Sequence, residues 1–232
     1  MMGARYAVFF VPPPDGALYR FGALALGYDS YSGAETASLA DEDLMPARWR
    51  ELTAAPRTYG FHGTLKPPFR LRDALTEDDL IKHFVWFANS HKAPAPFGVV
   101  IGLLDNFAAL VSPDAVPALC RLADSCVREF DRFRRPMTEA ERNRRLAQPL
   151  TTRQIAHLER WGYPYVFEDF RFHMTLTGRI PPDRGPAVLR FLENAWKRQS
   201  VDDKVAVRAI ALLRQPEPAG PFRVICEALL AP

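Results

Sequence analysis

The chain has 232 residues, 48% of them hydrophobic and 25% charged, so it is long enough to bury a sizeable core and has the composition of a soluble globular protein. Its net charge of +3 suits a phosphate-bearing ligand, whereas nucleic-acid-binding surfaces are usually more basic. Three cysteines without zinc-type spacing, and apolar runs too short for a signal peptide or a membrane span, predict a cytoplasmic protein with no membrane partner.

Hydrophobic periodicity and turn residues predict alternating strands and helices in the first half of the chain. Three prolines should end the first strand, and Thr76 with the acidic residues after it should cap a helix. Pro67-Pro68 should break the strand that precedes them, and Asp105-Asn106 should turn a hairpin. The expected elements are strands over 5–11 and 59–65, helices over 18–26, 41–55 and from 76 onward, and a hairpin of strands 97–104 and 107–112.

The second half of the chain predicts helices first and strands later. Ser112 should cap a helix that continues to about Phe133, and Gly162 should end a later one. We interpret the charged segment 138–153 as an exposed, salt-bridged helix, with a basic lid over a phosphate as the alternative. The remaining expected elements are helices over 151–161 and 188–196, and strands over 170–177, 205–213 and 222–230.

One four-residue phrase occurs twice, as His62-Gly63-Thr64-Leu65 and as His173-Met174-Thr175-Leu176. Each copy lies in a predicted strand, where side chains two positions apart share a face. The His and Thr of each copy should therefore point the same way, with apolar neighbours beneath them. A single His-x-Thr is a weak signal, but two full copies would arise by chance in only roughly a few per ten thousand shuffled chains.

The segments around the two copies share one order: His strand, double proline, amphipathic helix, strand, strand. We interpret residues 57–112 and 169–230 as two units of an internal duplication, within a single two-lobed domain over 1–232. Packing of the units about a pseudo-twofold axis would bring the two His strands together. The histidines would then be equivalent in position and could be opposite in role.

Two facing histidines suit chemistry on a phosphodiester, because imidazole titrates close to neutral pH. One imidazole could take a proton from the attacking oxygen while the other gives a proton to the departing oxygen. The hydroxyls of Thr64 and Thr175 could bond phosphate oxygens. Arg171 and Lys66 lie an even number of positions from the histidines, so in a regular strand they share the same face, a selection that we call strand parity. We expect them to supply the positive charge that offsets the charge developing in the transition state. The sequence has no HxxxH, HxH or His-carboxylate cluster and no phosphate loop, so we expect neither a metal site nor a cofactor.

These paired His-x-Thr-hydrophobic phrases resemble the two-histidine phosphoesterase superfamily, whose motif matches the residues His62, Thr64, His173 and Thr175. The resemblance implies an α+β bilobal fold in which two antiparallel sheets surround a central cleft, with helices outside. It also implies metal-independent catalysis. Longer phrases resemble one branch of the superfamily, uncharacterised proteins associated with bacterial phosphonate-utilisation (carbon–phosphorus lyase) operons; these phrases are residues 5–10, 18–22, 57–71 and 170–179.

The main hypothesis is therefore a metal-independent phosphoesterase, a hydrolase of a cyclic phosphodiester on a small phosphorylated sugar or nucleotide. The branch implies a role in phosphonate catabolism. Two alternatives stay open at this point. One is processing of RNA by a 2′,3′-cyclic phosphodiesterase or ligase-like enzyme, which would need a basic, aromatic groove. The other is a binding module that captures a phosphorylated metabolite without turning it over.

Overall fold

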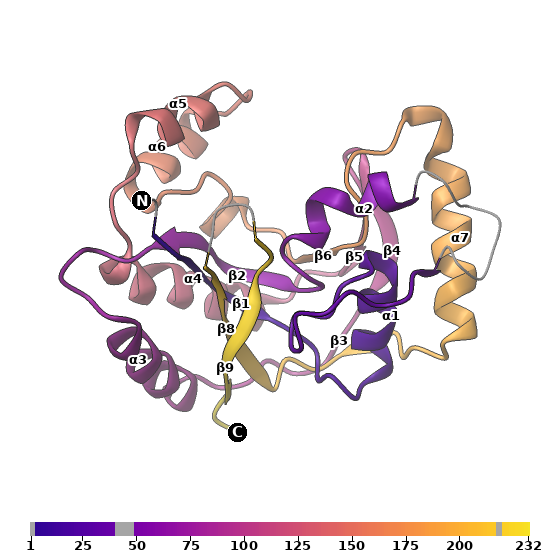
Figure 1. The fold of residues 1–232 in the computed structure, drawn as a ribbon, viewed down its shortest axis with the longest axis horizontal. Helices are drawn as coiled ribbons and strands as arrows, with labels where there is room; N and C mark the ends of the chain where they lie inside the picture. The colour runs from indigo at the N-terminus through magenta and orange to yellow at the C-terminus, as the bar shows by residue number, and fades with distance from the viewer. Residues whose placement is uncertain (1–2, 40–48, 217–219) are drawn as a thin grey trace.

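A seven-stranded antiparallel sheet runs through the computed structural model, which describes residues 3–39, 49–216 and 220–232 (Figure 1). The order of its strands is β4-β5-β6-β2-β1-β8-β9. A separate two-stranded sheet pairs β3 (Phe97–Gly98) with β7 (Lys204–Val205). The strands of the large sheet are β1 (Arg5–Phe10), β2 (Gly63–Arg70), β4 (Val100–Leu104), β5 (Phe107–Val111), β6 (His173–Thr175), β8 (Ala209–Gln215) and β9 (Arg223–Leu229).

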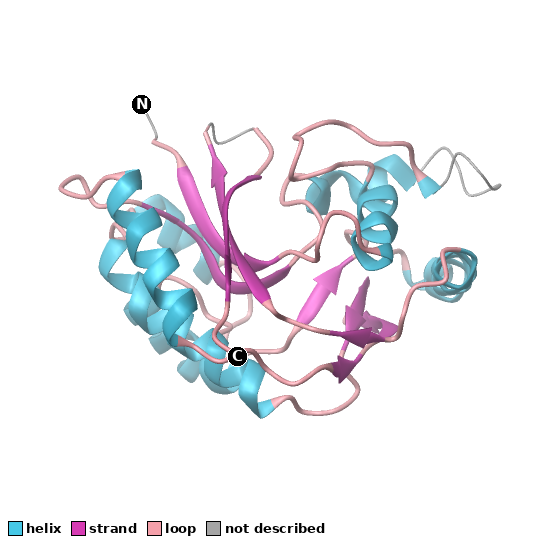
Figure 2. Ribbon diagram, turned by 90° about the horizontal axis from the view of Figure 1, so that it is seen from below, coloured by secondary structure: helices cyan, strands magenta, loops and turns pink. Residues whose placement is uncertain are grey.

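Two groups of helices lie on either side of the strands (Figure 2). On one side α3 packs against β8 and β9, and α4 against β2; on the other, α7 packs against β4 and β5, and α1 against α2. An α+β fold with an antiparallel sheet is thus confirmed. The helices are α1 (Ala17–Leu26), α2 (Trp49–Arg57), α3 (Glu77–Ser90), α4 (Pro117–Phe130), α5 (Glu139–Leu146), α6 (Thr152–Trp161) and α7 (Gly185–Arg198).

Local sequence signals set several element boundaries correctly. Thr76 caps α3 through a capping box with Asp79, whose carboxylate accepts a hydrogen bond of 3.0 Å from the Thr76 backbone N–H. Gly162 ends α6 in the left-handed conformation, at φ 77°. The Asp105-Asn106 turn joins β4 to β5 as expected. Of the helix expected over 41–55, residues 41–48 lie outside the described residues, and the described part continues to Arg57.

Several of the expected element bounds were wrong, and three of these differences have a clear local cause. Pro67 and Pro68 do not break β2, because they lie opposite Ala7 at a register shift, where the regular ladder is interrupted. The strand expected over 170–177 is reduced to β6, since the backbone N–H groups of residues 176 and 177 both turn to the carbonyl of Ala108. Helix α4 begins at Pro117 rather than at Ser112, whose hydroxyl donates to the carbonyl of Asp114 within the preceding loop.

The order β2-α3-β3-β4-β5 recurs as β6-α7-β7-β8-β9, as two repeat units would require. Equivalent strands meet across the units: β2 pairs with β6 and β3 with β7, both antiparallel, which is the relation that a twofold axis produces. Two antiparallel sheets around a central cleft were expected. Instead, hydrogen bonds join seven strands into one sheet, with β1 inserted between β2 and β8. Duplication itself stays a prediction.

Few backbone pairs connect the two halves of the large sheet, which are β4-β5-β6 and β2-β1-β8-β9. Strands β2 and β6 pair through Gly63 and Met174 alone, whereas β1 and β8 pair over five residues. The backbone of Gly63 is crowded, because a Cβ atom there would lie 2.4 Å from Cε2 of Phe172. That ring in turn packs edge-on against Phe97 of the two-stranded sheet, with 5.3 Å between the ring centroids.

We predict that Gly63→Ala destabilises the protein by about 1–3 kcal/mol, because the new methyl group overlaps the ring of Phe172. The measurement is urea unfolding followed by circular dichroism. Gly98→Ala is the matched control: it also lies in a strand, and a Cβ atom there would have nothing within 4 Å. Equal midpoints for the two variants would contradict a tight fit at the join.

Candidate active site

The two His-x-Thr phrases alternate between core and open face as strand parity predicts. Phe61 and Leu65 are 0% and 2% exposed, and Met174 and Leu176 are both 0% exposed. The His and Thr side chains of both phrases are half-buried. The apolar residues therefore anchor each phrase, and the polar ones lie together on the opposite face; these are His62, Thr64, His173 and Thr175.

The single pair Gly63–Met174 decides how the two phrases face each other. In an antiparallel pair, one step forward on one strand is matched by one step back on the other. Continuing that register sets Thr64 opposite His173, and His62 opposite Thr175. All four side chains then share one face, with each histidine across from the threonine of the other phrase. Lateral neighbours on a sheet face have Cβ atoms about 4.5–5.5 Å apart, so the four groups form a compact cluster.

Both histidines are held by the same hydrogen bond. Nδ1 of His62 lies 2.8 Å from the carbonyl oxygen of Gly60, and Nδ1 of His173 lies 2.8 Å from that of Arg171. A carbonyl oxygen can only accept, so each Nδ1 carries the proton and donates it. In the neutral ring, Nε2 is then the unprotonated nitrogen. For His62, Nε2 accepts from the hydroxyl of Thr64 at 3.1 Å.

Burial shifts the titration of both rings. The ring of His62 stacks on Phe9 with centroids 3.8 Å apart, and this desolvation lowers its pKa to about 4, against the opposing hydrogen bond to Gly60. A further, smaller lowering comes from the charge of His173. The pKa of His173 is also lowered, first by desolvation. Both imidazoles are therefore neutral at pH 7 and able to accept a proton at Nε2.

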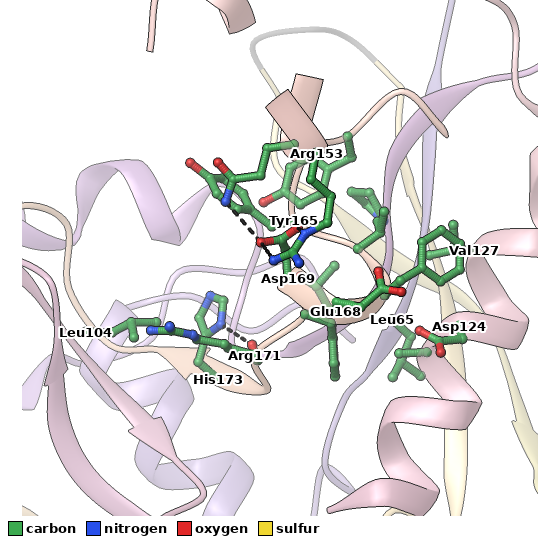
Figure 3. Close-up of a pocket in the computed structure, with 18 of the residues that line it drawn as sticks. Leu65, Leu104, Asp124, Val127, Arg153, Tyr165, Glu168, Asp169, Arg171 and His173 are labelled. Atoms are coloured by element: carbon green, nitrogen blue, oxygen red, sulfur yellow. Dashed lines mark hydrogen bonds and ion pairs between the residues drawn. The ribbon is translucent and has the colours of Figure 1, made fainter. Parts of the chain in front are cut away.

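A cavity of about 540 Å³ opens beside this cluster, a volume in the range of small-molecule sites. Thr64, His173 and the exposed side chain of Arg171 line it, whereas His62 and Thr175 are not among its lining residues. Figure 3 shows Arg171 and His173 side by side. The remaining walls come from helix α4, from the segment between α6 and β6, and from Leu104, Asp105 and Phe107 of the β4–β5 hairpin. The exposed guanidinium of Arg171 is thus available beside His173.

Lys66, the other cation that strand parity selected, does not reach this cavity, and its proposed role is corrected. Its side chain is 1% exposed, and Nζ donates to the carbonyl of Val127 at 3.0 Å and to Oδ1 of Asp131 at 3.1 Å. The parity argument assumed a regular strand, but β2 follows a register shift at this point. Burial lowers the pKa of Lys66 to about 8, against the opposing charge of Asp131.

The sequence analysis did not select the acidic residues that line the cavity. These include Asp124 from α4, and Glu168 and Asp169 from a 3-10 helix over Phe167–Asp169. Asp169 accepts hydrogen bonds of 2.9 and 3.0 Å from the guanidinium of Arg153. Phe167, the first residue of this 3-10 helix, adopts a positive φ of 55°. The carboxylates belong to no motif. Only their positions between α4 and the second His strand could have suggested them.

The charged segment before α6 matches the interpretation that we favoured. Helix α5 has no buried residue, and Arg142 donates a hydrogen bond of 2.7 Å to Glu159 of α6. It is an exposed, salt-bridged helix rather than a lid in contact with the cavity. Arg153 is different, since it lines the cavity from α6. No group of three His, Cys, Asp or Glu among the described residues is arranged to hold a metal ion, and no helix in the same residues is long and apolar enough to cross a membrane.

The fold and the site define an α+β protein with paired His-x-Thr phrases beside a cavity. Residues 64–223 match the family described as "Protein of unknown function (DUF1045)", and the chain belongs to that family. It is 33% identical over 221 residues to a protein of Janthinobacterium sp. (strain Marseille) named ribose 1,5-bisphosphate phosphokinase PhnN; the match covers 94% of this chain and 49% of that protein. A protein of the same name from Laribacter hongkongensis (strain HLHK9) is 29% identical over 226 residues, covering 95% and 50%.

The chain thus spans about half the length of these curated relatives. Two solved structures are also similar to it. One, described as a phosphoesterase, is 12% identical and covers all of both chains, with a TM-score of 0.45. The other is a conserved protein of unknown function, ATU0111, from Agrobacterium tumefaciens str. C58; it is 10% identical, with 97% of this chain and 86% of that chain covered and a TM-score of 0.47.

We predict that Asp131→Ala costs about 3–5 kcal/mol of stability, because it removes the anion that pairs with the buried ammonium of Lys66 and leaves that ammonium bonded to the Val127 carbonyl. Lys66→Met should cost less, since Asp131 keeps its 2.7 Å pair with Arg134. Denaturant unfolding measures both. Glu35→Gln, in a pair whose side chains are 70% and 71% exposed, is the control and should change little. If Lys66→Met lost more stability than Asp131→Ala, the structural role of the Lys66–Asp131 pair would be contradicted.

The depressed pKa of His62 predicts a pH dependence of stability. Its folded pKa of about 4 lies below the value of about 6.5 in an unfolded chain, so between these values the unfolded state binds more protons. Stability must then fall as the pH drops from 6.5 toward 4. His62→Gln lacks this titrating group. The difference in free energy of unfolding between wild type and the variant should therefore shrink as the pH falls from 6.5 toward 4. A gap that is constant from pH 7 to 4.5, measured by urea unfolding, would refute the shift.

Proposed function

We propose that this protein is a phosphoesterase that opens a cyclic phosphodiester on a small phosphorylated sugar or nucleotide, using two histidines and no metal ion. One observation carries the proposal. The pair Gly63–Met174 sets the two His-x-Thr phrases in antiparallel register, and both Nδ1 atoms are tied to carbonyls two residues upstream. This arrangement leaves Nε2 of each ring as the nitrogen that can exchange a proton, provided that the Thr64 hydroxyl turns from Nε2 of His62 to the phosphate when substrate binds. A cation and a cavity of suitable size lie beside it.

In the proposed step, water attacks phosphorus and a P–O bond to the sugar breaks. One imidazole accepts the proton of the attacking water at Nε2, and the other donates a proton to the departing oxygen. The hydroxyls of Thr64 and Thr175 donate to the non-bridging oxygens, and Arg171 offsets the charge that develops on them. Proton exchange with water then resets the two rings.

The lowered pKa values of His62 and His173 in the free protein are compatible with this scheme only if one of the two rings becomes protonated on substrate binding. Both rings are neutral before substrate binds, so the ring that acts as the acid must gain a proton on binding. A bound phosphodiester anion supplies the reason, because a negative charge nearby favours the imidazolium form. The rate should therefore depend on pH with two limbs, one for the base and one for the acid.

A phosphorylated ribose is the substrate that we favour. The relatives' printed name concerns ribose 1,5-bisphosphate, and the sequence phrases resemble proteins of phosphonate-utilisation operons. RNA processing is the alternative within enzymes. Against it, the cavity is lined by four carboxylates and two guanidinium groups, so it lacks the net positive charge that would attract a polyanion. RNA affinity that falls with added salt would support the alternative, and its absence would count against it.

We predict that His62→Ala and His173→Ala each lower kcat/KM by about 10²–10⁴-fold while the fold is kept, because each removes one of the two proton-transfer groups. The assay is ³¹P NMR of ring opening, with ribose 1,2-cyclic phosphate and adenosine 2′,3′-cyclic phosphate as the substrates. EDTA should not reduce the wild-type rate.

The control for the histidines is His91→Ala, since His91 bonds the carbonyl of Phe87 at the end of α3, outside the cavity. Arg171→Ala should also reduce the rate, with Arg190→Ala as its control, because Arg190 is exposed on α7 and does not line the cavity. Full activity in both single histidine variants would end the proposal.

A further inference from the structure

A second, smaller cavity of about 310 Å³ lies between helix α2 and the chain that follows β6. Its volume is at the lower end of the range of small-molecule sites. No residue lines both this cavity and the cavity beside His173, so the two are separate. The described residues that line the smaller one are Glu51, Leu52, Ala55, Gly178, Arg179, Pro181 and Arg184.

A proline within α2 fixes one wall of this cavity. In a regular helix the N–H of residue 56 would bond the carbonyl of Leu52, but Pro56 has no N–H. The carbonyl accepts instead a hydrogen bond of 2.5 Å from the N–H of Gly178. A side chain would crowd this contact, because a Cβ atom at position 178 would lie 2.9 Å from the Leu52 oxygen. The backbone on the two sides of the cavity is therefore directly bonded.

The segment 178–184 is also bound to the β4–β5 hairpin. The N–H of Ile180 donates to the carbonyl of Asn106 at 2.7 Å. Just before the segment, the hydroxyl of Thr177 accepts from the N–H of Ala108 at 2.9 Å. The lining backbone is thus held by both neighbours before any ligand binds. A preformed site of this kind loses less conformational entropy on binding than a site that must first become ordered.

Positive charge predominates in the smaller cavity. Arg179 and Arg184 line it, and Glu51 is the one acidic group among its described lining residues. Neither guanidinium forms a hydrogen bond, an ion pair or a ring contact within the part of the chain that the structure describes. The cavity beside His173 is different, since four carboxylates and two guanidinium groups line it. A small anion is therefore attracted more strongly to the smaller cavity.

We propose that this cavity is a second anion-binding site, in which Arg179 and Arg184 bind a phosphate group independently of the reacting phosphodiester. Each guanidinium presents N–H donors in a planar fork that matches two phosphate oxygens. The ligand is a phosphate monoanion or dianion, carried by a sugar phosphate or free in solution. The site belongs to a different cavity from the proposed reaction and does not depend on it.

Backbone amide shifts in ¹H–¹⁵N NMR spectra test the site residue by residue. The probes are D-ribose 5-phosphate, inorganic phosphate and D-ribose, each titrated at constant ionic strength. We expect both phosphates to shift the amides of Gly178, Arg179 and Arg184 to saturation, and D-ribose to leave them unchanged. The tighter of the two phosphates identifies the source of the bound group. The shifts should persist in Arg171→Ala, because Arg171 lines the other cavity.

Charge variants should change the affinity for D-ribose 5-phosphate in opposite directions. Arg184→Gln should weaken binding by about tenfold or more, because it removes charged donors from a half-buried position. Glu51→Gln should strengthen binding by about twofold to fivefold, because an exposed carboxylate near the anion is neutralised. Arg190→Gln is the matched control and should change little, since Arg190 is exposed on α7 and lines neither cavity.

Three results would overturn the second site. They are the absence of saturable shifts over 178–184 in wild type, an unchanged affinity in Arg184→Gln, and loss of the shifts in Arg171→Ala. The last result would mean that the shifts are transmitted from the other cavity. Failure of the proposed catalysis is a separate outcome: wild type that binds phosphate here but never opens ribose 1,2-cyclic phosphate would remove the phosphoesterase and keep this site.

Discussion

One cross-strand pair, Gly63 with Met174, holds the candidate site together. It is the only pairing between β2 and β6 that the described residues make, and it fixes which side chains of the two phrases are neighbours. A slip of one residue would turn every polar group of one phrase to the other face. The pair depends on a residue without a side chain, because the ring of Phe172 fills the space that a Cβ atom at position 63 would need. Gly63, which lies between His62 and Thr64 in the sequence, is thus part of the geometry of the site.

Much of the fold was readable from the sequence. The capping box at Thr76, the left-handed Gly162 and the hairpin at Asp105-Asn106 are local signals, and the residues that generate them also satisfy them. The burial alternation along the two phrases was predictable for the same reason. The insertion of β1 between β2 and β8 was not, since a strand's partners depend on contacts far along the chain.

The errors at the site share a physical cause, which is a local break in a regular pattern. Strand parity assigned Lys66 to the cavity, but the register shift in β2 and the presence of Asp131 on a distant segment turned its ammonium into the core. Asp124 could not be selected from the sequence, because no motif distinguishes it from an ordinary solvent-exposed acidic residue on a helix. Only the packed structure shows that its Oδ1 lacks a donor.

Desolvation acts on both sides of the cavity in opposite senses. It lowers the pKa of His62 and His173, so these rings rest in the neutral form, and it raises the pKa of Asp124. Both shifts have one cause, since burial disfavours the charged form of each group, and a bound anion would restore the imidazolium form of a histidine. In the proposed reaction, the phosphodiester therefore brings the negative charge that lets one ring act as the acid, while burial keeps the other ring neutral as the base.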